Sequence, residues 1–142
     1  GSTLAGIAFS NASVALVHGM SRPIGAAFHV PHGLSNAMLL PTVTAYSIPG
    51  APKRYADCAR AMGIATQQDN DEGANAKLIA ELVALNEELN VPTPEQFGID
   101  RAHFMGLLTT MAEQALASGS PSNNPRVPSA EDVIVLYKKL WP

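Results

Sequence analysis

Acidic side chains are absent from the first third of the chain, where no aspartate or glutamate precedes Asp57. Besides three histidines, the ionisable side chains between Gly1 and Pro52 are Arg22 and the Tyr46 phenol. A stretch so poor in charge is atypical of a solvated surface, so the sequence predicts that it is buried. Because an unpaired buried polar group costs about 1–3 kcal/mol, the imidazoles there should be paired, ligated or catalytic.

Cysteine, charge and long hydrophobic runs are also scarce. The single cysteine, Cys58, excludes an internal disulfide framework and is typical of a reducing cytoplasm, where we expect the protein to be located. No Cys/His spacing fits a zinc finger. The net charge of -3 argues against a nucleic-acid partner. Polar residues interrupt the longest apolar run, so neither a membrane-spanning helix nor a membrane partner is expected.

Helical signals cover most of the chain. Its 142 residues are enough for one domain with a core, and we expect residues 1–142 to form a single α-helical domain. Pro23 should end or kink the first helix near Arg22, Pro41 should kink the second, and Asp100 and Ser129 should cap the last two. No convincing strand pattern is present, so the predicted fold class is all-α, a helical bundle. The expected helices are at residues 3–21, 32–46, 52–62, 74–90, 101–118 and 130–140.

Three histidines fall within the uncharged stretch. His18 lies near the end of the first expected helix, and His32 follows a proline turn at the start of the second. A reversal of the chain between these helices would bring the two imidazoles face to face. Neutral imidazole suits Zn²⁺ or Fe²⁺, and a catalytic metal normally has three protein ligands, of which His29 could be the third. The alternative is that all three are hydrogen-bonded core histidines.

Arg22 follows His18 by four residues, so both side chains could lie on one helical face. In such uncharged surroundings a guanidinium is expected to need an anionic partner. That partner is either a cluster of backbone carbonyls or an acid elsewhere in the chain, or else a phosphate or substrate carboxylate bound by the guanidinium fork.

Several short motifs in this region resemble those of the iron-containing (group III) alcohol dehydrogenase family. The spacing of fourteen between His18 and His32 matches the two metal histidines of that family's signature. The matching segments are Leu16-Val17-His18-Gly19-Met20, Pro23-Ile24-Gly25-Ala26, Pro31-His32-Gly33-Leu34-Ser35-Asn36-Ala37 and Leu39-Leu40-Pro41.

The resemblance implies a fold, a reaction and a set of cofactors. Such enzymes have an N-terminal α/β part that binds NAD or NADP and a helical C-terminal part that carries the metal, Fe²⁺ or Zn²⁺. This chain resembles the later portion of the helical part, so His18 and His32 would be metal ligands. The other two ligands, an Asp and a His, belong to an earlier helix that is absent here. The implied substrates are small alcohols, aldehydes or ketones, and we expect the chain alone to be inactive.

Two positions depart from the family pattern. Many members have a histidine at the position of Arg22, close to the nicotinamide and the substrate, and asparagine is common at the position of His29. The resemblance therefore implies catalytic roles for Arg22 and His29. Arg22 would contact either a carboxylated substrate or a cofactor phosphate, and His29 would take over the proton relay.

Two other interpretations remain open. The chain could be a stand-alone helical module with vestigial histidines that forms a homo-oligomer through its apolar residues 1–45, because exposed apolar patches usually mark an interface. It could also be a non-redox, metal-dependent relative with a similar helical domain.

Overall fold

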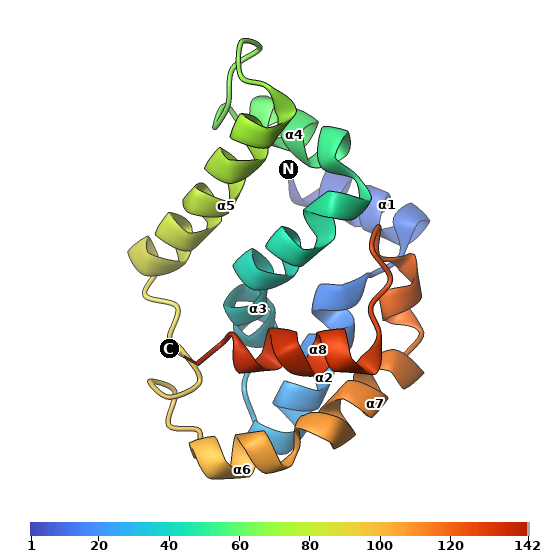
Figure 1. Ribbon diagram of the computed structural model, residues 1–142, viewed down its shortest axis with the longest axis vertical. Helices are drawn as coiled ribbons and strands as arrows, with labels where there is room; N and C mark the ends of the chain where they lie inside the picture. The colour runs from blue at the N-terminus through green and yellow to red at the C-terminus, as the bar shows by residue number, and fades with distance from the viewer. Residues whose placement is uncertain (142) are drawn as a thin grey trace.

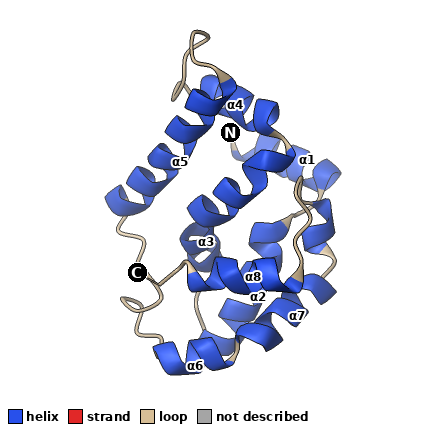
Figure 2. Ribbon diagram, viewed as in Figure 1, coloured by secondary structure: helices blue, strands red, loops and turns tan. Residues whose placement is uncertain are grey.

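A computed structural model describes residues 1–141, and all the regular structure in that part of the chain is helical (Figures 1 and 2). The all-α prediction is therefore confirmed. The α-helices are α1 (Ser2–Ala12), α2 (Leu16–Phe28), α3 (His32–Ser47), α4 (Pro52–Ala61), α5 (Asp71–Glu88), α6 (Arg101–Gly106), α7 (Leu108–Ala117) and α8 (Ala130–Lys138). Two 3₁₀ turns, η1 (Ile48–Gly50) and η2 (Ser120–Asn123), complete the helical structure.

Side-chain caps fix where three of the helices begin. The Asp100 carboxylate accepts a hydrogen bond from the His103 N–H at 2.7 Å, and Ser129 forms a reciprocal capping box with Asp132. Both predicted starts are thus confirmed. By contrast, α5 begins at Asp71 rather than near residue 74, because Asn70 accepts a hydrogen bond from the Gly73 N–H at 2.8 Å and acts as the N-cap.

The single helix expected at residues 3–21 is instead two helices, bent by 98° at Ser13–Ala15. Ser13 has a φ of 62°, and the Asn123 side chain donates a hydrogen bond to the Val14 carbonyl at 3.0 Å. The helix is therefore interrupted where a side chain from a distant loop forms a hydrogen bond with its backbone. It continues as helix past Arg22 and through Pro23 to Phe28.

Pro41 lies inside α3, which continues unbroken to Ser47. A proline lacks the N–H that would bond the carbonyl four residues earlier, which here is that of Ala37. The Asn86 side chain of α5 donates to this carbonyl at 2.8 Å. The missing helical hydrogen bond is thus replaced by one from a neighbouring helix.

The helices form two cores. The larger is built mainly by α2, α3, α6, α7 and α8, and its most buried side chains include Leu16, Met20, Leu39, Phe104 and Tyr137. The smaller lies between α4 and α5, where alanines allow the two helices to approach closely. In Figure 1, α4 and α5 form the upper hairpin, and α2, α7 and α8 cross below it. The site described below lies on the rim of the larger core.

Helix α1 does not follow the prediction that the apolar front of the chain is buried. All of its residues are exposed, including Leu4 at 72%, Ile7 at 56% and Phe9 at 55%. No helix described in residues 1–141 is by itself long and apolar enough to cross a membrane, although α1 and α2 taken together have the required length and composition. The pattern of apolar residues on all sides indicated a buried helix, but no described element covers it.

Candidate functional site

The structure brings His18 of α2 and His32 of α3 side by side. Their ring centroids are 5.2 Å apart and the ring planes are inclined by 56°. Two imidazoles on one tetrahedral ion, with metal–nitrogen bonds of about 2.0–2.1 Å, place their centroids roughly 5 Å apart. The juxtaposition expected from the sequence is confirmed, and its geometry fits two ligands of one metal ion.

Each histidine is positioned by its helix, and the His32 ring also has a hydrogen-bond neighbour. On the opposite face of α2, Leu16 and Met20 are fully buried and fix the rotation of the helix. On α3, the Asn36 side-chain amide lies 3.1 Å from Nε2 of His32, one helical turn away. The amide N–H of Asn36 can donate to Nε2, and a metal bound through Nε2 would displace this hydrogen bond.

Electrostatics keep His18 in the form that a metal requires. Partial burial, followed by the positive charges of His32 and Arg22, lowers the pKa of His18 below its ordinary value of 6.5. A neutral imidazole has a free nitrogen lone pair, whereas a protonated one cannot ligate. At neutral pH His18 is therefore ready to bind a cation.

The histidine pair is only part of a metal site. Within residues 1–141 no group of three His, Cys, Asp or Glu side chains is close enough to hold one ion, so His29 does not join the pair. His29 lies at the end of α2, exposed, with a left-handed backbone at φ 55°. The donor set fits a transition metal, but it supplies two of the three or four ligands such sites contain.

An apolar pocket of about 530 Å³ adjoins the pair. Its polar lining residues are Ser13, His18 and Asn36, and its apolar walls include Phe9, Val17 and Leu40. The Asn36 side-chain oxygen is buried and has no hydrogen-bond partner within the described residues. No role was predicted for Asn36 from the sequence, although its position one helical turn after His32 could have indicated one. A pocket of this kind suits a short aliphatic molecule with one or two polar groups.

Arg22 has neither of the two protein partners considered from the sequence, a cluster of backbone carbonyls or an acid, within residues 1–141. It lies exposed on α2, and no ion pair or hydrogen bond engages its guanidinium within residues 1–141. Because Arg22 is exposed, the cost of desolvation that the prediction assumed does not apply. Arg22 is nevertheless close enough to His18 to lower the pKa of that imidazole.

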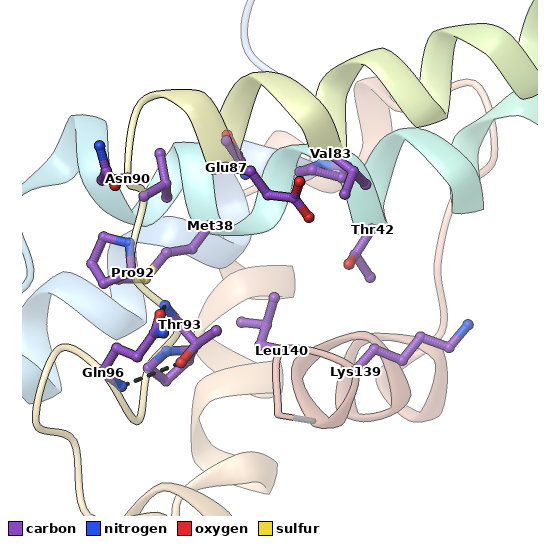
Figure 3. A pocket seen from close by; sticks show the side chains of 14 residues that line it. Met38, Thr42, Val83, Glu87, Asn90, Pro92, Thr93, Gln96, Lys139 and Leu140 are labelled. Carbon is purple, nitrogen blue, oxygen red and sulfur yellow. Dashed lines mark hydrogen bonds between the residues drawn. The ribbon is translucent and has the colours of Figure 1, made fainter.

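A larger pocket, of about 760 Å³, lies between α3, α5 and the end of α8, and neither histidine lines it (Figure 3). Its polar groups are largely engaged in holding the fold. Asn86 bonds the Ala37 carbonyl, and Thr93 and Gln96 bond each other's backbone N–H groups. The pocket has one carboxylate, Glu87, and one ammonium, Lys139, and it offers no cluster of reactive groups.

Fold and site together define an all-helical domain with a pair of neighbouring, metal-compatible histidines. The chain belongs to the iron-containing alcohol dehydrogenase family, since the family model described as "Fe-containing alcohol dehydrogenase family, C-terminal" matches residues 1–141. This confirms the resemblance drawn from the motifs around His18 and His32.

Two characterised relatives show the same relationship. Lactaldehyde reductase of Escherichia coli (strain K12) is 34% identical over 142 residues, covering 99% of this chain and 36% of the relative. 1-Propanol dehydrogenase of Salmonella typhimurium is 37% identical, covering 98% of this chain and 38% of the relative. The chain thus spans little more than a third of the length of these relatives.

Solved structures show the same fold. A crystal structure of 1,3-propanediol oxidoreductase superposes with a TM-score of 0.89 at 31% identity, covering 97% of this chain and 35% of that one. The iron-containing alcohol dehydrogenase of Thermococcus thioreducens gives a TM-score of 0.82 at 37% identity, covering 97% and 34%.

Proposed function

We propose that this chain is the metal-bearing helical portion of an NAD- or NADP-linked alcohol dehydrogenase, which oxidises an alcohol or reduces an aldehyde or ketone by hydride transfer. The observation that carries the proposal is the pairing of His18 and His32 at a centroid distance of 5.2 Å. It is supported by relatives whose names include a reductase of lactaldehyde and a dehydrogenase of 1-propanol.

Each part of the site has a proposed task. His18 and His32 would supply two nitrogen ligands, and Fe²⁺ or Zn²⁺ bound there would act as a Lewis acid toward the substrate oxygen. The pocket beside them would hold the carbon chain of a small alcohol or aldehyde and exclude water from it. His29, exposed at the end of α2, is the proposed proton relay. We further propose that the nucleotide binds to a separate part of a longer protein, which also supplies the missing ligands.

Metal retention tests this proposal. The longer protein, loaded anaerobically with Fe²⁺ or Zn²⁺ and desalted, should keep one ion per chain by elemental analysis. His18→Ala and His32→Ala should each lose it, because metal sites need three or four ligands. His103→Ala is the matched control, since His103 is an exposed histidine on α6 and should leave the metal in place. Retention of the ion by both site variants would refute the assignment.

The 142-residue chain alone should behave differently. With two ligands it should hold metal weakly, and it should form no NADH from short alcohols when Fe²⁺ or Zn²⁺ is added. One tightly held ion per chain, lost on His18→Ala, would instead place the missing ligands on a neighbouring copy. Turnover by the chain alone would contradict our proposal that it is incomplete.

Two companion proposals have narrower support. A cytoplasmic location is supported by Cys58, which is exposed and unpaired, as thiols are in reducing compartments. A non-redox, metal-dependent relative is the alternative reaction class, and alcohol-dependent formation of NADH or NADPH by the longer protein would exclude it.

A further inference from the structure

Arg22 is a permanently charged side chain of α2, one helical turn after His18. The interval of four residues places both side chains on one side of the helix. Arg22 is exposed and His18 is partly exposed. Ala26, one further turn along this face, is exposed and small.

No carboxylate is available within the front of the chain to neutralise this face. The first acidic residue is Asp57, and the salt bridges of residues 1–141 use Lys53, Arg60, Lys77 and Arg126 but not Arg22. Lys53, by contrast, has Asp57 at 2.9 Å on its own helix. The guanidinium of Arg22 is thus planar, permanently charged and without a counterion in the described residues, and it lies one helical turn from His18.

We propose that Arg22 is a specificity-determining residue that binds the carboxylate of the substrate, so that the preferred substrate is a short hydroxy acid or its oxo counterpart rather than an uncharged alcohol. This inference rests on the proposed function and deepens it. One helical turn separates His18 from Arg22 by about 6 Å along the axis, which suits a hydroxyl and a carboxylate joined by a few carbons.

Binding to the chain as it stands gives a test that needs neither metal nor turnover. We would titrate the 142-residue chain with butyrate and with 1-butanol at constant ionic strength and follow backbone amide shifts by NMR. Butyrate should bind more tightly than 1-butanol and should shift amides of α2 between residues 18 and 29. Arg22→Gln should weaken butyrate binding about 10- to 100-fold, the range typical of a charge-assisted hydrogen bond, and should leave 1-butanol unchanged.

Two further variants make the test specific. Arg22→Lys keeps the charge and should restore part of the affinity, but it lacks the bidentate fork. Arg54→Gln removes another exposed arginine, on α4, and should change neither titration. If Arg22→Gln binds butyrate as tightly as the unsubstituted chain does, the proposal is overturned. It is also overturned if Arg54→Gln loses as much butyrate affinity as Arg22→Gln, because the binding would then depend only on the net charge of the chain.

Kinetics of the longer protein distinguish the source of the anion. In Arg22→Gln, kcat/KM for 4-hydroxybutyrate relative to 1-butanol should fall about 10- to 100-fold, mainly through KM. An equal fall for both substrates with weaker dinucleotide binding would assign Arg22 to a cofactor phosphate and overturn the proposal. If neither substrate is turned over, the proposed function fails, whereas the butyrate titration still decides the role of Arg22.

Discussion

At the scale of single residues, Tyr137 connects the functional helix to the rest of the core. Its hydroxyl donates a hydrogen bond to the Met20 carbonyl at 2.7 Å, two residues after His18. Tyr137 is fully buried, and burial raises its pKa above the ordinary value of 10.0. The phenol therefore stays neutral and keeps donating at any pH at which the protein is folded.

Removing this hydroxyl should weaken the core and change its response to alkaline pH. Tyr137→Phe should lower the free energy of unfolding by about 0.5–1.5 kcal/mol at pH 7, the usual net contribution of a hydrogen bond. Because the pKa is raised on folding, the unfolded chain loses its proton first, so stability should fall as pH rises above 10. Urea unfolding between pH 7 and 11 should show a smaller alkaline loss for Tyr137→Phe. A parallel pH dependence would contradict the assignment.

Which residues of the site could be predicted depended on whether local geometry decides their position. His18 and His32 flank a short turn between two helices, so their meeting follows from the spacing and from the proline and glycine at the turn. The surroundings of Arg22 could not be predicted in this way. Low charge along the sequence suggested burial, but exposure depends on which face of α2 the other helices cover, and that is decided by tertiary packing.

At the scale of helices, the contact between α3 and α5 depends on one amide. Asn86 supplies the hydrogen bond that Pro41 denies to the Ala37 carbonyl. This carbonyl lies next to Asn36 and on the helix that carries His32. The orientation of the site helix is therefore tied to α5 at this point.

Asn86→Ala should leave the Ala37 carbonyl unpaired in a partly buried position. We expect a loss of about 1–3 kcal/mol in the free energy of unfolding, the cost of an unsatisfied buried group. Glu87→Ala is the adjacent control, because Glu87 is exposed and its replacement should change stability by less than about 0.5 kcal/mol. Chemical denaturation of both variants measures these losses of unfolding free energy. Equal losses would show that the hydrogen bond from the Asn86 amide does not contribute specifically to stability.

Helix ends could be predicted where the cause lies within a few residues. The caps at Asp100 and Ser129 are of this kind, and so is the end of α4, which is followed by Gly63 with its left-handed backbone at φ 75°. The break at Ser13–Ala15 could not be predicted, because its stabilising contact comes from Asn123 more than a hundred residues later. The helix expected at residues 101–118 is likewise divided at Leu107, directly after Gly106, a glycine signal that the prediction passed over.

At the scale of the whole molecule, α1 is an apolar helix that the rest of the described chain leaves uncovered. Leu4, Ile7 and Phe9 are all more than half exposed, and the helix carries no charged side chain. Apolar surface of this kind on a helix generally marks a surface that another chain or segment covers. The burial predicted for this part of the chain is therefore wrong for α1 within the described residues, because the apolar pattern reports the chemistry of the helix and not which surface covers it.

Self-association of the 142-residue chain is the last prediction. If α1 is the contact, the chain should form dimers or larger species by light scattering at about 100 µM, because burying apolar surface contributes about 25 cal/mol per Å². The triple variant Leu4→Glu, Ile7→Glu, Phe9→Glu should be monomeric with an unchanged helical circular dichroism spectrum. Leu89→Glu is the matched control, since Leu89, the C-cap residue of α5, is 64% exposed and its replacement should leave the mass unaltered. If the unsubstituted chain is monomeric, the interpretation as a stand-alone association module is excluded. If Leu89→Glu disrupts assembly as strongly as the triple variant does, the contact does not lie on α1. Assembly that only the α1 variant disrupts would show that this helix is an interface, independently of whether the histidine pair binds a metal.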